Sequence, residues 1–321
     1  MRWLGGRGCA ARRPAPPARA ATFTPTGALA ERPSTVGRVA FSPDGALLAT
    51  AGGDGASELW EARSGRPLHA LPGHRGATGD LAFSPDGAVL ATAGRDSAVG
   101  LWDVRTGALL RTLATGEEPL LAVAFGADGA ALTTVSLTGI VRWWDAGTGR
   151  PLLTLPRRLG FTSGRAFSPD GMTIATAYGE IRLWDAGTGR PLRTLGPRQE
   201  LASAIAFSPD GRRLATGSLV GTIQLWDAAT GRRLGGDAGP VWADGRPAPL
   251  FAVAFRPDGA AIATAGEDGA ARLWDLRAGR LGRTIAGPVG PLRALAFSPD
   301  GRRLATGGAD AVVRVWDLGG G

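Results

Sequence analysis

The sequence predicts an all-β protein assembled from seven stacked copies of one small antiparallel sheet. The segment FSPDGRRLATG occurs twice, at residues 207–217 and 297–307. Looser copies bring the total to seven, and consecutive copies begin 42, 42, 42, 40, 48 and 42 residues apart. A period of this length is typical of repeat proteins whose units stack on one another. The copies begin at Phe41, Phe83, Phe125, Phe167, Phe207, Phe255 and Phe297.

Each copy contains the signals of four short strands, as residues 79–113 illustrate. GDLAF alternates toward Phe83 and predicts a first strand, and SPDG supplies the Pro and Gly that a tight turn requires. AVLATAG, AVGLWDV and LLRTL predict three further strands separated by turns. At the last turn, the Asp103 carboxylate can accept backbone N–H groups across the loop. One such sheet cannot bury both of its faces alone, so neighbouring copies must cover it.

The repeat fills the chain and predicts one domain over residues 21–321, preceded by a tail over residues 1–20. The formal net charge is +8, but residues 1–30 hold five arginines and no acidic residue, which leaves +3 for the rest. This near balance differs from the basic stripe of a nucleic-acid-binding protein. We therefore do not expect a nucleic-acid partner.

The Arg-, Ala- and Pro-rich tail permits several interpretations. Its composition favours a solvated, disordered segment, although an arginine-rich tail can also contact an anionic surface. Its lack of acidic residues is similar to an organelle transit peptide, and a linker from an upstream domain or a start codon assigned too early explains it as well. Residues 1–20 contain no apolar run of seven residues, and the whole chain contains none of eighteen. The sequence thus predicts a cytoplasmic protein without a membrane span.

Several enzyme classes lack their essential residues in this chain. All 36 basic residues are arginine, and asparagine is also absent, which a GC-rich genome explains. Without lysine there is no P-loop, Schiff-base amine or kinase strand lysine. One cysteine, Cys9, and two histidines, His69 and His74, cannot form an intramolecular disulfide or a three-histidine zinc site. We therefore expect no catalytic residue, no cofactor and no metal.

A tryptophan ends the third predicted strand of every copy. Six of the seven are followed by Asp, and Trp60 is followed by Glu61. The distance from Phe to Trp is 19 residues in six copies and 17 in the fourth. In this pattern, residues 22–318 resemble WD40-repeat proteins, and the composition resembles bacterial members from high-GC genomes. The resemblance implies a seven-bladed β-propeller, a ring in which each four-stranded antiparallel sheet is one blade.

The seventh copy has no fourth strand of its own, because DLGGG directly follows its third strand. A segment that precedes the first copy, FTPTGALA at residues 23–30, aligns with the other fourth strands. In this alignment Pro25 matches Pro67, and Leu29 matches Leu71. We expect this N-terminal strand to complete the last blade and close the ring, as the resemblance implies.

The resemblance also implies a hydrogen-bonded tetrad of His, Ser or Thr, Asp and Trp that stabilises many WD40 blades. The pattern is complete once, and it predicts a structural rather than a catalytic histidine. Blades 1 and 6 carry an arginine at the place of the histidine, which predicts the exposed pairs Arg32–Asp54 and Arg246–Asp268. The residues of the complete tetrad are His74, Thr92, Asp96 and Trp102.

Blades 3, 4 and 5 depart furthest from this pattern and lose the turn aspartate. In WD40 proteins, the contact positions of the top face lie six residues before the Phe and one before the turn Asp. In these blades, those positions hold large apolar residues, and the shortened turn of blade 4 adds a tyrosine. A loop with six extra residues before blade 6 adds Trp242, which either contacts the partner or packs against the blade edge. The predicted partner-binding patch is Leu137, Phe161, Tyr178, Leu201, Leu219 and Trp242.

Two functions follow from the resemblance. The one we favour is a non-enzymatic, monomeric scaffold that binds a protein or peptide in bacterial signalling or complex assembly. The alternative is a propeller hydrolase or lactonase with a site in the central channel. That alternative needs carboxylates or histidines on the inner strands, which offer little beyond Asp80.

Overall fold

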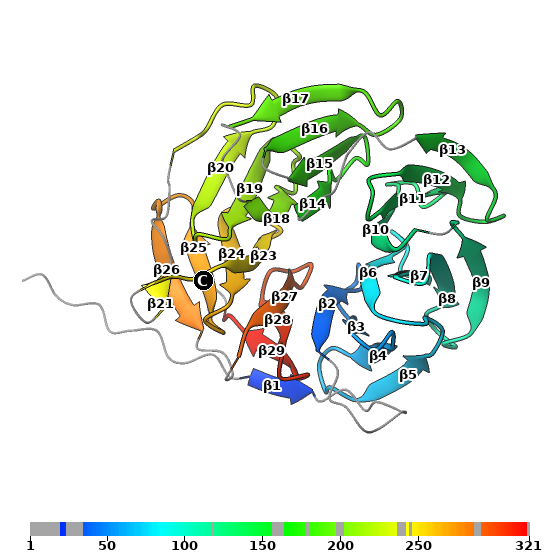
Figure 1. Ribbon diagram of the computed structural model, residues 1–321. Coiled ribbons are helices and arrows are strands. Elements are labelled where there is room, and N and C mark those ends of the chain that lie inside the picture. The colour runs from blue at the N-terminus through cyan, green and yellow to red at the C-terminus, as the bar shows by residue number, and fades with distance from the viewer. Residues whose placement is uncertain are drawn as a thin grey trace, which may run out of the picture.

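The computed structural model of the protein shows a ring of seven radial sheets and confirms the predicted all-β propeller (Figure 1). It describes residues 35–116, 118–155, 164–177, 180–196, 202–235, 246–285 and 290–319, and the backbone alone of 20–23 and 242–243. Every regular element in these ranges is a β-strand. The described part of the chain contains no helix long and apolar enough to cross a membrane.

The first strand of each blade, which is the one that follows the connection from the previous blade, lies nearest the centre of the ring. The next strands follow outward in chain order, with the N-terminal strand outermost in blade 7 (Figure 1). Blades 1 and 2 contain β2 (Val36–Phe41), β3 (Leu47–Gly52), β4 (Ser57–Glu61), β5 (Pro67–Leu71), β6 (Thr78–Phe83), β7 (Val89–Gly94), β8 (Ala98–Asp103) and β9 (Leu109–Ala114). Blades 3 and 4 contain β10 (Leu120–Phe125), β11 (Ala131–Ser136), β12 (Val141–Asp145), β13 (Pro151–Leu155), β14 (Gly164–Phe167), β15 (Thr173–Ala177), β16 (Ile181–Asp185) and β17 (Pro191–Leu195).

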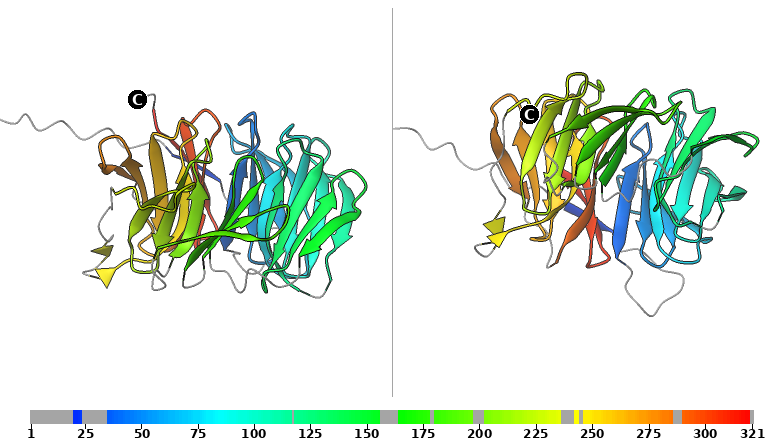
Figure 2. Two further views of the ribbon diagram at one scale, coloured as in Figure 1. Left: turned by 90° about the horizontal axis from the view of Figure 1, so that it is seen from above. Right: turned by 45° about the horizontal axis from the view of Figure 1, so that its top comes forward.

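Blade 5 contains β18 (Ala202–Phe207), β19 (Arg213–Ser218) and β20 (Ile223–Asp227). Blade 6 contains β23 (Leu250–Phe255), β24 (Ala261–Gly266), β25 (Ala271–Asp275) and β26 (Arg280–Ile285). Blade 7 contains β27 (Leu292–Phe297), β28 (Arg303–Gly308), β29 (Val313–Asp317) and the N-terminal β1 (Ala20–Phe23). Seen from the side, the strands run between two faces made of turns (Figure 2).

The hydrophobic core lies between neighbouring blades rather than inside any one of them. One cluster joins Leu59 and Leu71 of blade 1 to Leu90 and Trp102 of blade 2, and each of these side chains is buried. Another joins blades 7 and 1 and so continues the core around the ring. Because each sheet covers its neighbour, the period of 42 residues is also the period of the core.

Each blade repeats one hydrogen bond between its second and third strands, which is buried in blades 1 to 5 and partly buried in blades 6 and 7. In blade 2, the Trp102 indole Nε1–H donates to Thr92 Oγ1 over 2.9 Å, and Thr92 is fully buried. The bond satisfies the polar end of a buried indole, which costs free energy when it has no partner. The other six pairs, at 2.9–3.1 Å, are Trp60–Thr50, Trp144–Thr134, Trp184–Thr176, Trp226–Thr216, Trp274–Thr264 and Trp316–Thr306.

The turns are built as the sequence predicts. In SPDG of blade 2, Ser84 Oγ donates to Asp86 Oδ1 over 2.6 Å, and Gly87 takes the left-handed conformation with φ 72°. After the third strand, the Thr106 side chain and backbone N–H both donate to Asp103 Oδ1 over 2.7 Å. These bonds favour the ionised form and hold the pKa of Asp103 below its usual value, so the carboxylate organises the turn.

The strand that closes the ring lies earlier in the chain than the sequence alignment placed it. β1 pairs antiparallel with β29, with Ala20 opposite Trp316 and Phe23 opposite Val313. In blade 1, Leu71 lies opposite the position of β4 that corresponds to Val313 of β29. Phe23 therefore takes the place that the alignment assigned to Leu29. Closure by an N-terminal strand is thus present, but its register is six residues from the predicted one. The rest of the predicted segment, residues 24–30, lies outside the described residues.

Blade 5 differs from the predicted four strands. Within residues 202–235, its fourth position is reduced to a single bridge between Trp226 and Arg233, followed by a bond from Leu234 N–H to the Leu225 carbonyl over 2.8 Å. The loop that follows contains its own two-stranded ladder, in which β21 (Trp242–Ala243) pairs with β22 (Arg246–Pro247). The described part of blade 5 thus contains three strands and one bridge, and the six extra residues of the sequence follow it.

Candidate functional site

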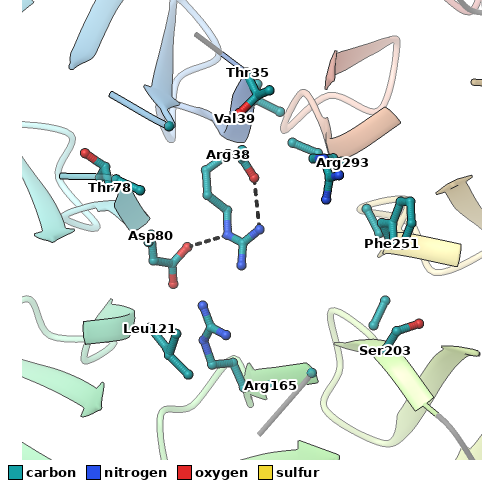
Figure 3. A pocket seen from close by; sticks show the side chains of 18 of the residues that line it. Thr35, Arg38, Val39, Thr78, Asp80, Leu121, Arg165, Ser203, Phe251 and Arg293 are labelled. Atoms are coloured by element: carbon teal, nitrogen blue, oxygen red, sulfur yellow. Dashed lines mark hydrogen bonds and ion pairs between the residues drawn. The ribbon is translucent and has the colours of Figure 1, made fainter. Parts of the chain in front are cut away.

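A cavity of about 650 Å³ lies at the centre of the ring and is lined by residues from all seven blades (Figure 3). Its wall consists of the first strands, which the topology brings together around the axis. The inner strand of every blade contributes, with Val39, Leu121 and Ile205 among its apolar members. A propeller places such a cavity at its axis because seven sheets converge there without meeting.

One end of the cavity reaches a face that we call the top face, defined by the turns between the second and third strands. Gly53, Arg95 and Leu137 belong to these turns, and all three line the cavity. In blades 1, 2, 3, 6 and 7, this turn is bonded to the residue at the start of the inner strand of its own blade, as in the bond from Arg95 N–H to the Ala77 carbonyl over 2.9 Å. The two kinds of contact position that the sequence predicts for the top face are therefore direct neighbours.

An ion pair crosses the cavity wall between blades 1 and 2. Arg38 Nε lies 3.2 Å from Asp80 Oδ1, and an Nη of the same guanidinium donates to the Gly37 carbonyl over 2.9 Å. The second oxygen, Asp80 Oδ2, accepts the Val123 backbone N–H over 3.2 Å. Both oxygens of this carboxylate thus have partners, which favours a positioning role for Asp80 over that of a general base.

Arg165 enters the cavity from blade 4 at a position where the other six blades carry an aliphatic residue. That position, two residues before the Phe, holds Val39, Leu81 and Val123 in blades 1 to 3 and Ile205, Val253 and Leu295 in blades 5 to 7. Arg165 Nε is buried without a hydrogen-bond partner. Burial first, and then the positive charges of Arg38 and Arg95, which Asp80 partly offsets, together lower the pKa of its guanidinium to about 9.

Sequence reasoning missed this residue, although the signal was present. The inner strands were compared for carboxylates and histidines, and GRAF of blade 4 contains neither. A comparison of the seven copies at this one position shows one arginine and six aliphatic residues. Because a partly buried guanidinium whose Nε has no hydrogen-bond partner carries a desolvation penalty, such an exception marks a functional candidate.

The structure brings the four predicted tetrad residues together as a hydrogen-bonded chain. His74 Nδ1 lies 3.0 Å from Asp96 Oδ1, and His74 Nε2 lies 2.8 Å from Thr92 Oγ1, which also accepts the Trp102 indole N–H. A neutral His74 that donates from Nδ1 to Asp96 accepts the Thr92 hydroxyl proton at Nε2. The chain therefore links the top-face turn of blade 2 to its core, and the His74 side chain is 4% exposed.

Comparison with known protein families identifies the family to which these repeats belong. The family model described as WD domain, G-beta repeat matches residues 23–61, 65–103, 189–227, 244–275 and 279–317, which is more than half of the chain. The chain belongs to the WD40 family. No curated protein is similar enough in sequence to match it.

The WD40 match is interrupted over residues 104–188, which contain all four strands of blade 3 and the first three strands of blade 4. These blades still have the buried Trp–Thr bond, but their top-face networks differ from the tetrad. In blade 3, Glu118 Oε2 accepts hydrogen bonds from Ser136 and Thr138. In blade 4, Arg182 pairs with Glu180. The polar network that the sequence suggested was lost is thus replaced in these two blades by residues at other positions.

In blade 6, the predicted pair of Arg246 and Asp268 is wrong. Asp268 is paired with Arg272 on β25 of its own blade, at 2.5 Å, and Arg246 is exposed. Blade 7 repeats the arrangement with Arg314 and Asp310 at 2.6 Å. The arginine therefore comes from the third strand rather than from the histidine position. Arg32, the other predicted partner, lies outside the described residues.

Glu58 of blade 1 occupies the same third-strand position as Arg272 and Arg314, but it carries the opposite charge. Its side chain is buried, its Oε2 has no hydrogen-bond partner, and Asp54 lies nearby. Burial first, and then the charge of Asp54, raise the pKa of Glu58 to about 7. The folded protein therefore holds this proton more tightly than the unfolded chain does.

Glu58→Gln should stabilise the protein at pH 8 and have little effect at pH 4. The raised pKa means that Glu58 costs stability as the pH rises from its unfolded value of 4.5 through about 7, and the cost persists above that range. A shift of this size corresponds to about 3 kcal/mol. Urea unfolding of both proteins across this pH range measures the difference. A difference that does not change with pH would contradict the assignment.

The predicted partner-binding patch is described in part. Leu137 and Leu219 are 39% and 43% exposed on the turns of blades 3 and 5, and Val220 beside Leu219 is also exposed. The same turn position holds Gly53, Arg95, Glu267 and Ala309 in blades 1, 2, 6 and 7. Phe161, Tyr178 and Leu201 lie outside the described residues, and Trp242 is described by its backbone alone, as part of β21. The described residues contain no group of three His, Cys, Asp or Glu side chains that could hold a metal ion.

Proposed function

We propose that this WD40 protein is a non-enzymatic scaffold that binds a protein or peptide on its top face over blades 3 to 5. The observation that carries the proposal is the exposure of Leu137 and Leu219 at turn positions where the four described turns of the other blades hold small or charged residues. Exposed apolar side chains that gather on one face of a soluble protein are typical of interaction sites. WD40 membership supports the same conclusion, because propellers of this family commonly mediate protein–protein interaction.

Two further observations support this location. The family match is interrupted over most of blades 3 and 4, so these blades depart from the general pattern where the patch lies. Leu137 also lines the central cavity, which makes the patch continuous with the mouth of the channel. Phe161, Tyr178 and Leu201 belong to the proposed surface by their positions in the repeat, and Trp242 belongs to it by its place in the extended loop before blade 6. A cytoplasmic role in bacterial signalling or complex assembly, as a monomer, is part of the same proposal.

Affinity capture from an extract of the source organism, followed by mass spectrometry, tests the proposal. Leu137→Asp and Leu219→Asp should change the free energy of unfolding by about 0.5 kcal/mol or less, because both side chains are exposed. Both variants should lose the captured partner. Phe161→Asp and Leu201→Asp extend the test to the part of the patch known from sequence.

Met172→Asp is the matched control. Met172 is 62% exposed, but it lies in the turn between the first and second strands of blade 4, on the face opposite the top face. This variant should retain the partner. Retention of the partner by the Leu137 and Leu219 variants would show that the binding surface lies elsewhere.

A further inference from the structure

Arg165 is a cation for which the fold has no evident structural need. Its position is filled by aliphatic side chains in the other six blades, and Val39, Leu81, Val123, Ile205 and Val253 are buried in the clusters between blades. The described residues give Arg165 Nε no hydrogen-bond partner. An apolar residue would complete the core of blade 4 as it does elsewhere. The guanidinium of Arg165 therefore indicates a role in binding a ligand rather than in stabilising the fold.

The surroundings of Arg165 are positive. The guanidinium groups of Arg38 and Arg165 face one another across the channel, with Asp80 beside Arg38 (Figure 3). Arg95 and Arg293 also line the cavity, so its charged residues are four arginines and one aspartate. Arg293 lies over the Phe251 ring, with its guanidinium carbon 5.2 Å from the ring centre. Since Asp80 is already paired with Arg38, the remaining positive charge has no acidic counterpart among the described residues that line the cavity.

We propose that the central channel binds a phosphoryl group, held by Arg165 together with Arg38 and Arg95. Converging guanidinium groups suit an anion with several acceptor oxygens, because each arginine presents five N–H donors in a rigid fork. A carboxylate has two oxygens and one charge, and a single bidentate arginine satisfies it. A phosphoryl group carries a charge of about −1.5 to −2 and three acceptor oxygens, which matches the excess charge better.

The cavity has room for more than the phosphoryl group itself. Its volume of about 650 Å³ lies within the usual range for small-molecule sites. Two sources of the group fit this space, a free phosphorylated small molecule and a phosphorylated side chain inserted from the top face. Because Leu137 belongs both to the cavity wall and to the apolar patch, the second source would place the phosphoryl group beside the proposed protein contact.

The phosphoryl site does not rest on the proposed function. Its test uses purified protein and inorganic phosphate, whereas the scaffold function is tested by capture of a partner on the leucine patch. If the protein binds phosphate but captures no partner, the phosphoryl site stands and the scaffold function is rejected. If the protein captures a partner on the leucine patch but binds no phosphate, the scaffold function stands and the phosphoryl site is rejected.

Isothermal titration calorimetry with inorganic phosphate, at constant ionic strength, is the direct test. We expect phosphate to bind the wild-type protein, and Arg165→Met to weaken that binding by about tenfold or more, because a charge-assisted contact is lost. Arg111→Met is the control, since Arg111 is exposed on β9 of blade 2, at the outside of the ring. The control variant should bind phosphate as the wild type does. Absence of phosphate binding by the wild type, or equal binding by Arg165→Met, would overturn the proposal.

A second measurement separates a ligand-binding arginine from a structural one. Without phosphate, Arg165→Met should melt at the same temperature as the wild type or higher, because a partly buried guanidinium whose Nε lacks a hydrogen bond is replaced by an apolar side chain. With phosphate present, the wild type should gain thermal stability and the variant should not. A variant that melts well below the wild type without phosphate would assign Arg165 to the structure and reject the site.

A pair of peptides that differ in one phosphoserine distinguishes the two sources. If the phosphoserine peptide binds more tightly than phosphate, and Arg165→Met loses this binding, the phosphoryl group belongs to a protein partner. Binding of phosphate but of neither peptide assigns it to a small molecule. Equal binding of both peptides, independent of Arg165, would contradict a phosphoryl site.

Discussion

Deleting residues 20–30 should lower the thermal unfolding midpoint by about 10 °C, whereas deleting residues 1–18 should leave it unchanged. The first deletion removes β1, the partner of β29, and exposes one edge of blade 7. Val313 and Val315 of β29, both buried, lose the strand beside them. We estimate a loss of roughly 5 kcal/mol, and a chain of this size shifts by about 2 °C per kcal/mol.

Differential scanning calorimetry of the two truncated proteins measures this effect. The deletion of residues 1–18 is the control, because it removes a longer segment but leaves β1 intact. If the shorter deletion proves harmless and the longer one lowers the midpoint, the ring is not closed by β1. The strand pairing of blade 7 would then need another partner.

Thr92→Val should destabilise the protein by about 3–4 kcal/mol, although the two side chains have almost the same shape. Thr92 Oγ1 accepts the Trp102 indole N–H and contacts His74 Nε2, and the residue is fully buried. Valine would leave both of those groups without a partner in the core. Each buried polar group that loses its hydrogen bond costs about 1–3 kcal/mol.

Thr216→Val is the matched control for this prediction. Thr216 of blade 5 is buried and accepts the Trp226 indole N–H over 3.1 Å, and the repeat places no histidine beside it. Its replacement should cost about 1–2 kcal/mol, since one donor rather than two groups is affected. Urea unfolding compares the two variants. Equal losses would mean that the bond to His74 contributes nothing to stability.

The sequence was sufficient to predict the ring and the tetrad because both repeat at fixed intervals. The Phe and Trp of each copy lie on the first and third strands, and their spacing determines where the blades begin. The residues His74, Thr92, Asp96 and Trp102 likewise follow a known spacing. Such features are local within one repeat, so alignment of the copies finds them.

The features that were mispredicted depend on residues that do not occupy equivalent positions. The segment AATFTPTGALA contains small and apolar residues in two registers six apart, and the sequence alignment chose the one that β1 does not use. Glu118 of blade 3 and Arg272 of blade 6 supply polar partners from positions outside the expected pattern. Arg165 stands out in the sequence only when the same position is compared across all seven copies, and its lack of a hydrogen-bond partner at Nε is visible only in the structure.

The pairing of β1 with β29 has a consequence for how the protein folds. Phe23 and Val313 are partners, although about 290 residues separate them along the chain, so the contact has a high entropic cost of loop closure. On the ribosome, β1 must wait until the last blade has been synthesised. During that time the growing arc of blades presents an unpaired edge, and such edges accept strands from other chains. At high concentration, refolding is therefore expected to yield dimers in which each β1 closes the ring of the other molecule.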